Sequence, residues 1–262
     1  MKNIRGTFRF LQFIILILFF MSRYLLSTVF SGRDLKKGLK ERQAFAKAIK
    51  KVIGVELEVK GKPSSEAAIY VCNHRSYYDP GAIAIDLRYS VVVAKAEIRN
   101  WPLIGYATDF IGIIFVNRDS SDSRKATREA MSKALEDGLS ILIYPEGTTG
   151  DRSTTLDFLP GTFATAVKMN IPIIPVAIEY KDTRAAWVDP HESFFAHYTK
   201  CFNHKRTPVK LRYGQAIFHE DVLTFKQMAQ DWIDKNLLEM QAEFGGVAWP
   251  ATVNERIKLT GR

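Results

Sequence analysis

The chain is poor in cysteine, and this limits both its fold and its compartment. Cys72 and Cys201 are the only cysteines among 262 residues. Two cysteines provide no disulfide framework, so a reducing compartment is the simpler interpretation, with a single pairing left open. The hydrophobic fraction of 47% is enough for a large core, and the length fits one large domain with an appendage.

The sequence also lacks two patterns that mark common kinds of active site. It contains no Gly-x-Ser-x-Gly elbow, which argues against a serine hydrolase. Three of its histidines fall in one short segment, but their spacings match no zinc site. We therefore expect no metal site and no cofactor. The histidines are His74, His191, His197, His204 and His219.

Most of the chain lacks an excess of charge of either sign. Residues 61–262 hold 24 Lys/Arg and 24 Asp/Glu, whereas residues 1–60 hold 13 Lys/Arg and 4 Asp/Glu. The formal charge of +9 thus comes entirely from the N-terminal segment. A nucleic-acid-binding protein more often carries its basic residues over a folded face, so we expect no nucleic acid partner.

This basic segment is also strongly apolar. Residues 10–21 are apolar except for one glutamine, and a second apolar run over residues 24–30 follows Arg23. Residues 33–53 then have the pattern of an amphipathic helix rich in lysine, as found in helices that lie on anionic membranes. The segment therefore points to a membrane surface.

We predict that residues 1–53 form a membrane-docking helical element and that residues 54–262 form the domain that follows. Two alternatives stay open. Residues 10–30 reach across a bilayer if Arg23 is carried inside, and residues 1–21 resemble a signal peptide without a clear cleavage site. Basic residues flank the apolar run at both ends, so they give no orientation.

After residue 54, strand and helix patterns alternate. This predicts an α/β fold with a mostly parallel central sheet flanked by helices. Residues 181–207 are aromatic and mixed in charge, and we interpret them as an excursion from the sheet. The predicted strands are 55–59, 67–72, 90–94, 111–116, 139–144, 171–178 and 209–213, and the predicted helices are 80–87, 122–137, 161–169 and 225–243.

His74 and Asp79 follow a predicted strand, where functional residues of such sheets gather. An imidazole can take a proton near neutral pH, and a nearby carboxylate fixes its tautomer. Each residue also has an ordinary interpretation, because Asp before Pro80 is a good helix cap and a lone His is often structural. The pair is a candidate base with its orienting group.

Three further segments add chemistry to this pair. Arg118 ends the apolar segment that begins at Gly112, where a guanidinium can grip a phosphate. Glu146 can accept hydrogen bonds, and Gly147 and Gly150 permit a tight backbone beside a ligand. Residues 171–178 contain two prolines, which alone would suggest an edge or bulged strand.

Together, these segments resemble the glycerophospholipid acyltransferase family, which includes bacterial lysophosphatidic acid acyltransferases. The resemblance covers roughly residues 55–180 and rests on four ordered blocks. It implies a membrane enzyme of phospholipid biosynthesis that moves a fatty acyl group from acyl-CoA or acyl carrier protein to a lysolipid hydroxyl. The matching positions are the His-x4-Asp of His74 and Asp79, residues 112–118, the Pro-Glu-Gly-Thr of residues 145–148, and residues 172–178.

The resemblance also assigns roles to residues. His74 and Asp79 are the expected catalytic pair. The protein is expected to be membrane-associated, at the cytoplasmic face of the inner (plasma) membrane. Many family members that acylate lysophosphatidic acid carry Arg where this chain has Thr149, so lyso-ornithine lipid and other acceptors stay open. A non-catalytic lipid-binding protein and a lipid hydrolase or thioesterase are the alternative functions. The expected substrate-binding residues are Arg118, Glu146, Gly147, Thr148 and Arg152.

Overall fold

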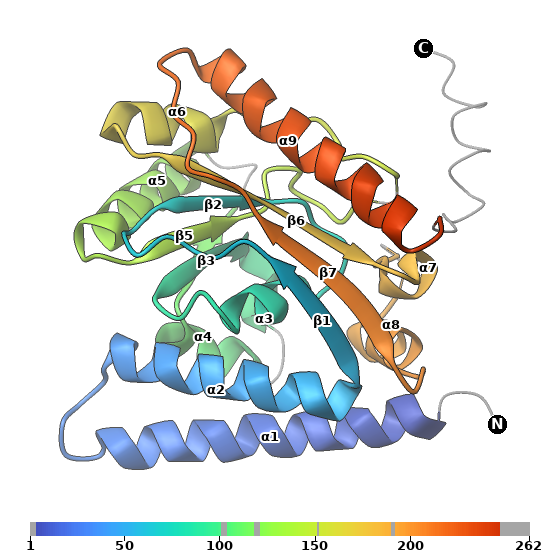
Figure 1. Ribbon diagram of the computed structural model, residues 1–262. Helices are drawn as coiled ribbons and strands as arrows, with labels where there is room; N and C mark the ends of the chain where they lie inside the picture. Colours follow the sequence, from blue (N-terminus) through green and yellow to red (C-terminus); the bar gives the residue numbers. More distant parts are fainter. Residues whose placement is uncertain (1–3, 101–103, 118–120, 151, 190–191, 247–262) are drawn as a thin grey trace.

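Seven strands of the described residues form one sheet, in the order β1-β7-β6-β2-β5-β3-β4 (Figure 1). The computed structural model describes residues 4–100, 104–117, 121–150, 152–189 and 192–246. Neighbouring strands run parallel except β6 and β7, so the predicted mostly parallel sheet is confirmed. The strands are β1 (Val55–Lys60), β2 (Ile69–Cys72), β3 (Ser90–Lys95), β4 (Ile113–Val116), β5 (Ser140–Ile143), β6 (Ile173–Tyr180) and β7 (Thr207–Tyr213).

Helices cover both faces of this sheet (Figure 1). Alternate side chains of β2 serve the two faces: Ile69 and Val71 pack in one apolar cluster, and Tyr70 and Cys72 pack in the other. Both faces of a mostly parallel sheet are thereby buried. One face carries α5 (Ser121–Glu136), α6 (Gly161–Met169) and α9 (Val222–Glu243), and the other carries α2 (Leu35–Ile53), α3 (Asp79–Ala84) and α8 (Phe194–Cys201).

The strand β6 lies inside the sheet, between β7 and β2, and not at the edge that its prolines alone would suggest. The ladder with β7 begins at Val176, which pairs with Tyr213. Beside Pro175 the neighbour is Gly214, whose N–H donates to the Pro175 carbonyl at 2.8 Å. The missing proline N–H therefore falls at the end of the β7 ladder.

The first helix, α1 (Ile4–Thr28), runs beside α2 along the outside of the molecule (Figure 1). It has 25 residues and a mean hydropathy of 1.9 over its most apolar window, so by length and composition it could cross a membrane. Arg9 fixes its start, because the guanidinium donates to the carbonyls of Phe202, His204 and Lys205 at 2.8, 2.5 and 3.1 Å. Tyr24 fixes its end by stacking on Phe110 at 4.3 Å between ring centroids.

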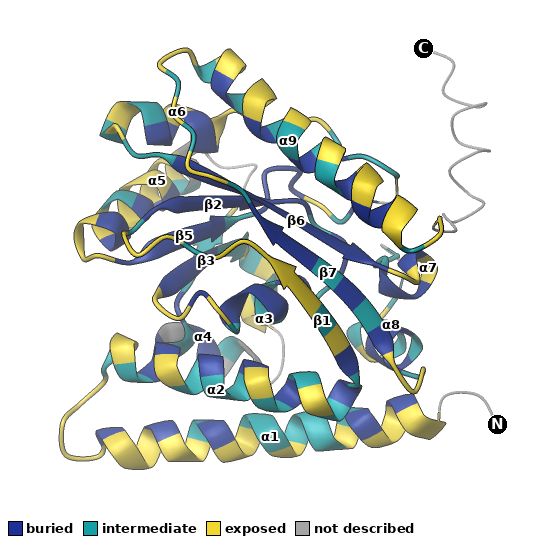
Figure 2. Cartoon of the chain, viewed as in Figure 1, coloured by how far each residue is buried: buried dark blue, intermediate teal, exposed yellow. Residues whose placement is uncertain are grey.

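α1 has an exposed side (Figure 2), and many of its exposed side chains are apolar. These side chains recur at helical spacing, and each is at least half exposed. We call this set the outer face of α1; it consists of Ile4, Phe8, Leu11, Ile15, Leu18, Leu25 and Leu26.

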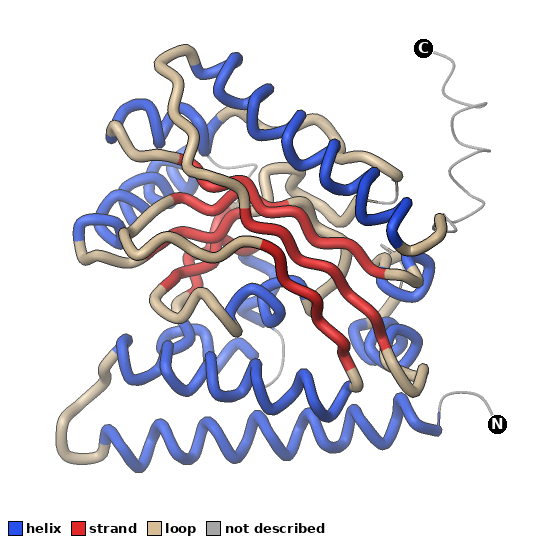
Figure 3. The backbone as a smooth tube through the Cα atoms, in the orientation of Figure 1, coloured by secondary structure: helices blue, strands red, loops and turns tan. Residues whose placement is uncertain are grey.

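Several short helices were not predicted from the sequence (Figure 3). The 3₁₀ helix η1 (Ala96–Asn100) and α4 (Ile104–Ile111) lie between the predicted strands 90–94 and 111–116, where we predicted no helix. The strand predicted to start at residue 111 starts at Ile113, because Gly112 adopts a φ of 73° after the last turn of α4. The excursion at 181–207 contains α7 (Thr183–Ala186) and α8.

Candidate active site

His74 and Asp79 meet at the carboxyl end of β2. The His74 Nδ1 atom lies 2.7 Å from Asp79 Oδ2, and the Asp79 side chain is fully buried while the imidazole is 19% exposed. A carboxylate at Nδ1 favours the tautomer that carries its proton there and leaves Nε2 as the basic nitrogen. The pair therefore has the geometry of a base with its orienting group.

Asp79 is held by further donors. Its Oδ2 accepts the N–H groups of Arg75 and Ser76 at 2.6 and 2.8 Å, and its Oδ1 accepts the Tyr180 hydroxyl at 2.7 Å. The ordinary role of helix cap does not apply, since Tyr78 occupies the N-cap position of α3 and Asp79 is already helical. The carboxylate instead closes the turn that leads back to His74.

The ring and the backbone of His74 are also fixed. Its imidazole stacks on Tyr144, with 4.2 Å between the ring centroids and 24° between the planes. The backbone N–H of His74 donates to Glu146 Oε1 at 2.9 Å, and the backbone carbonyl of His74 accepts the Gly150 N–H at 2.7 Å. Both backbone groups of His74 are thus held by the segment that follows β5.

Glu146 is buried, and both of its carboxylate oxygens already accept hydrogen bonds from the protein. This bears on its predicted contact with substrate. Its second oxygen accepts the Leu156 N–H at 2.8 Å. Burial raises the pKa of the Glu146 carboxyl, and the nearby Arg75 guanidinium opposes that rise. In this arrangement the carboxylate positions backbone, and its direct contact with substrate stays a prediction.

Two glycines shape the same segment. Gly147 adopts a φ of 75°, which favours glycine. A Cβ on Gly150 would come within 2.8 Å of Glu146 Oε2 and 3.0 Å of Arg75 Nη1. The sequence indicated a tight backbone here, and the structure shows that the close approach at Gly150 is to side chains of the protein itself.

A cavity of about 1110 Å³ opens beside His74. Gly147, Thr148 and Thr149 line it together with His74, and its walls are otherwise mostly apolar. Lys95, at the end of β3, and Arg128, on α5, also line it and are exposed. Many of the apolar wall residues come from the N-terminal helices, among them Phe13, Ile17, Phe20 and Met21 of α1 and Phe45 and Ile49 of α2.

Arg118 and Arg152 are the two remaining predicted substrate-binding residues. Arg118 lies outside the described residues. Arg152 is exposed and does not line the cavity, so its role stays a prediction. Thr149 donates its hydroxyl to the Val188 carbonyl at 3.2 Å and thereby joins the excursion after β6 to the cavity wall.

The structure adds a second histidine that the sequence did not single out. His197, on α8, lines the cavity and is 1% exposed, and its Nε2 lies 3.2 Å from Ser76 Oγ. Burial, with a contribution from Lys200, lowers the pKa of His197 to about 4. His197 is therefore neutral at pH 7.

A cavity with a histidine–carboxylate pair at the carboxyl end of a parallel strand suits transfer chemistry on an apolar substrate. The family model described as Acyltransferase matches residues 56–179. This match confirms the resemblance to the glycerophospholipid acyltransferase family that the sequence shows over roughly residues 55–180.

Several curated proteins are similar to this chain. It is 32% identical to lyso-ornithine lipid O-acyltransferase of Pseudomonas aeruginosa over 48% of each protein. It is 28% identical to 1-acyl-sn-glycerol-3-phosphate acyltransferase of Neisseria gonorrhoeae over 53% of this chain and 55% of that protein. Against lysophosphatidylcholine acyltransferase 1 of Danio rerio the identity is 38%, over 47% of this chain and 24% of that protein. The chain thus matches about half of these bacterial relatives and less of the fish protein.

A solved structure is similar over nearly the whole chain. The crystal structure of the 1-acyl-sn-glycerophosphate (LPA) acyltransferase of Thermotoga maritima superposes with a TM-score of 0.64. The match covers 89% of this chain and 98% of that one at 22% identity. It supports the fold.

Proposed function

We propose that this protein transfers a fatty acyl group from a thioester to a hydroxyl of a lysolipid. The observation that carries the proposal is the His74–Asp79 contact of 2.7 Å at the edge of a large, mostly apolar cavity. An apolar cavity suits an acyl chain, and an imidazole held by a carboxylate suits a hydroxyl that must lose its proton.

The chemistry needs few groups. His74 Nε2 takes the proton of the acceptor hydroxyl while the hydroxyl oxygen attacks the thioester carbonyl. The C–S bond then breaks, and the imidazolium returns the proton to the departing thiolate. Asp79 keeps the ring oriented and stabilises its positive charge in between. Because a thioester is already activated, the reaction requires no acyl-enzyme.

Substrate binding follows from the cavity wall. Gly147 and Thr148 line the same cavity as His74, and this supports their assignment as substrate contacts. Lys95 and Arg128 offer positive charge to an anionic head group or to the phosphates of coenzyme A. Arg118, Glu146 and Arg152 are kept as predicted contacts. The donor is acyl-CoA or acyl carrier protein.

We also propose that residues 1–53 dock the protein on a membrane, at its cytoplasmic face. The outer face of α1 presents apolar side chains in a row, and the lysines of α2 add positive charge nearby. Both ends of α1 are tied to the domain by Arg9 and Tyr24. A helix held in this way fits one that lies in a leaflet better than one that crosses the bilayer.

The transfer is tested by following thiol release from acyl-CoA in the presence of a lysolipid. We expect His74→Ala to reduce turnover by about 10²–10⁴-fold and to leave membrane attachment unchanged. His204→Ala is the matched control, since this imidazole is 60% exposed and lies outside the cavity wall. Wild-type turnover in His74→Ala would remove the base assignment.

A panel of acceptors separates the possible functions. Lysophosphatidic acid and lyso-ornithine lipid are the two acceptors to compare first, since Thr149 stands where an Arg would support a phosphate. Thiol release at the full rate without any acceptor would indicate a thioesterase. Binding of lysolipid without thiol release would indicate a lipid-binding protein.

Docking is tested with vesicles that contain anionic lipid. Leu11→Glu with Ile15→Glu places two charges on the outer face of α1, and we expect most of the protein to leave the vesicle fraction. Undiminished sedimentation with vesicles would contradict docking through this face.

A further inference from the structure

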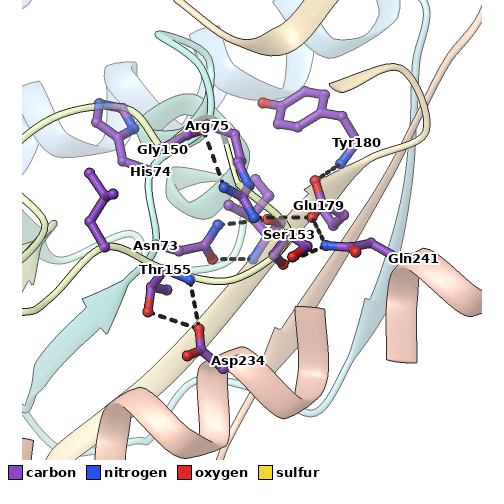
Figure 4. Close-up of polar contacts among 12 residues, drawn as sticks. Asn73, His74, Arg75, Gly150, Ser153, Thr155, Glu179, Tyr180, Asp234 and Gln241 are labelled. Atoms are coloured by element: carbon purple, nitrogen blue, oxygen red, sulfur yellow. Dashed lines mark hydrogen bonds and ion pairs between the residues drawn. The ribbon is translucent and has the colours of Figure 1, made fainter. Parts of the chain in front are cut away.

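The segment after β5 holds His74 from both sides, and this segment is itself held by a distant helix. Glu146 accepts a hydrogen bond from the backbone N–H of His74, and the Gly150 N–H donates to the backbone carbonyl of His74. The chain then continues through Ser153 and Thr155, which lie against α9 (Figure 4). The next residue, Leu156, also contacts α9, since its carbonyl accepts from Gln230. The position of His74 thus depends on what fixes this segment.

One connection runs through Asp234 of α9. Its Oδ1 accepts both the N–H and the hydroxyl of Thr155, at 2.7 and 2.8 Å. The next residue, Leu156, donates its N–H to Glu146 Oε2 at 2.8 Å. Gln230 of α9 adds bonds of 3.1 Å to the Thr155 hydroxyl and to the Leu156 carbonyl. Asp234 is therefore joined to the His74 N–H through Thr155, Leu156 and Glu146.

A second connection runs through Gln241, two turns further along α9. Its amide donates to the Ser153 carbonyl at 2.7 Å and to Glu179 Oε2 at 2.9 Å. Glu179 pairs with Arg75 at 3.3 Å, and both side chains are buried, at 0% and 2% exposure. Arg75 donates to the Gly150 carbonyl at 3.2 Å, and the same glycine holds the His74 carbonyl (Figure 4).

The two connections reach the two backbone groups of one residue, the N–H and the carbonyl of His74. A buried ion pair and buried hydrogen bonds are costly unless fully satisfied, so such networks have one well-defined geometry. Displacing a reacting group by about 1 Å can cost about 10²-fold in rate. α9 lies wholly beyond residues 56–179, the part that the Acyltransferase family model matches.

We propose that α9 is a positioning element of the active site, with Asp234 and Gln241 as its positioning residues. They set the backbone of His74 by fixing Gly150 and residues 153–156. For its effect on turnover this inference rests on the proposed acyl transfer. Its effect on the imidazole can be observed without turnover.

The experiment compares substitutions on α9 in the full-length protein. Asp234→Ala removes the acceptor of both Thr155 donors, and we expect kcat per folded molecule to fall roughly 10- to 100-fold with little change in KM for acyl-CoA. Asp234→Asn keeps an oxygen at this place and should restore most of kcat. The matched control is Asp231→Ala, an exposed aspartate one turn earlier that bonds to Gln227.

A spectroscopic readout separates positioning from plain stability. The ring signals of His74, assigned by their loss in His74→Asn, should shift in Asp234→Ala and stay in place in Asp231→Ala. Gln241→Ala, judged by the same two measurements, tests the second connection and serves if Asp234→Ala does not fold. A merely structural α9 would lower the melting temperature and leave both kcat and the ring signals as in the control.

Each outcome points to one conclusion. If the wild type shows no lysolipid-dependent thiol release, the proposed function fails, and the ring signals still decide the role of α9. If the wild type is active but Asp234→Ala and Gln241→Ala match Asp231→Ala in kcat and in the His74 signals, the positioning role of α9 is overturned.

Discussion

The two sides of the cavity are built from different interactions. On the sheet side, His74, Asp79 and Glu146 are held by hydrogen bonds of 2.6–2.9 Å, and the Asp79 carboxylate has four donors. On the side of α1 and α2, the wall consists mainly of aliphatic and aromatic side chains such as Phe13, Ile17 and Phe45.

This difference separates two requirements of the reaction. Directional bonds fix the atoms that exchange a proton, because small displacements there have a large effect on rate. Apolar packing fixes only the volume available to an acyl chain. It tolerates exchange of one hydrophobic residue for another of similar size. Substitutions on the two sides should therefore change different quantities.

Asp79→Asn should have the largest effect and should affect turnover far more than folding. The amide oxygen can still accept from Arg75 and Ser76, but the negative charge that stabilises the imidazolium is lost. We expect kcat to fall by about 10²–10⁴-fold. Steady-state thiol release beside a thermal melt measures both quantities.

Tyr180→Phe is its control, because it removes one donor to Asp79 and leaves the charge in place. Its expected cost is about 1 kcal/mol of stability and less than about tenfold in kcat. If Asp79→Asn kept wild-type turnover, the imidazolium would need no carboxylate.

His197→Gln should change the dependence of stability on pH. The pKa of His197 is lowered to about 4 in the fold, whereas an unfolded histidine titrates near about 6.5. The contribution of the neutral His197 side chain to the free energy of unfolding is complete above about pH 6.5 and is lost as the pH falls toward 4. The wild type should thus lose up to about 3 kcal/mol more than His197→Gln between pH 7 and pH 4.

Denaturant unfolding at several pH values measures this difference. His204→Gln is the control, since its imidazole is 60% exposed. Parallel stability curves for wild type and His197→Gln would show that the fold accepts an imidazolium at position 197.

Arg9→Met tests the polar contact that ties α1 to the domain. The substitution leaves three carbonyls without their donor, and we expect a loss of about 2 kcal/mol and earlier proteolysis within α1. Arg5→Met is the matched control, because Arg5 is exposed and bonds to the single carbonyl of Asn203. Equal protease resistance of both variants would mean that packing alone holds α1.

Ile17→Trp should have the smallest effect and should act on substrate preference. Ile17 lines the cavity, so a larger side chain there leaves less room for a long acyl chain. We expect kcat/KM for hexadecanoyl-CoA to fall about tenfold relative to octanoyl-CoA. The control is Ile15→Trp, on the outer face of the same helix. An unchanged ratio would place the acyl chain elsewhere.

Much of the fold could be predicted from local patterns. All seven strands and the four helices predicted after residue 54 are present, with ends displaced by a few residues. They were predictable because hydrophobic periodicity and capping residues are local features of the sequence. The His74–Asp79 contact was predictable for the same reason, since one turn joins the two residues. The helices η1 and α4 were missed because glycine and proline in that segment suggested a loop.

The remaining site contacts depend on strand order, which no local pattern contains. Tyr180 reaches Asp79 only because β6 lies beside β2. His197 reaches Ser76 from an excursion more than 100 residues away in the sequence, and Asp234 reaches Thr155 from the last helix. Tyr144 was the exception, since its position at the carboxyl end of β5 was a usable signal.

The pairing of β1 with β7 has a consequence for biosynthesis. β1 neighbours only β7 in the sheet, and the carbonyls that receive Arg9 lie just before β7 in the chain. At typical rates of translation, the ribosome makes β7 on the order of ten seconds after β1. During that interval β1 lacks its partner strand, and the nascent α1 lacks its carbonyl partners. A lipid surface or a chaperone that shelters it until synthesis passes residue 213 would therefore favour correct folding.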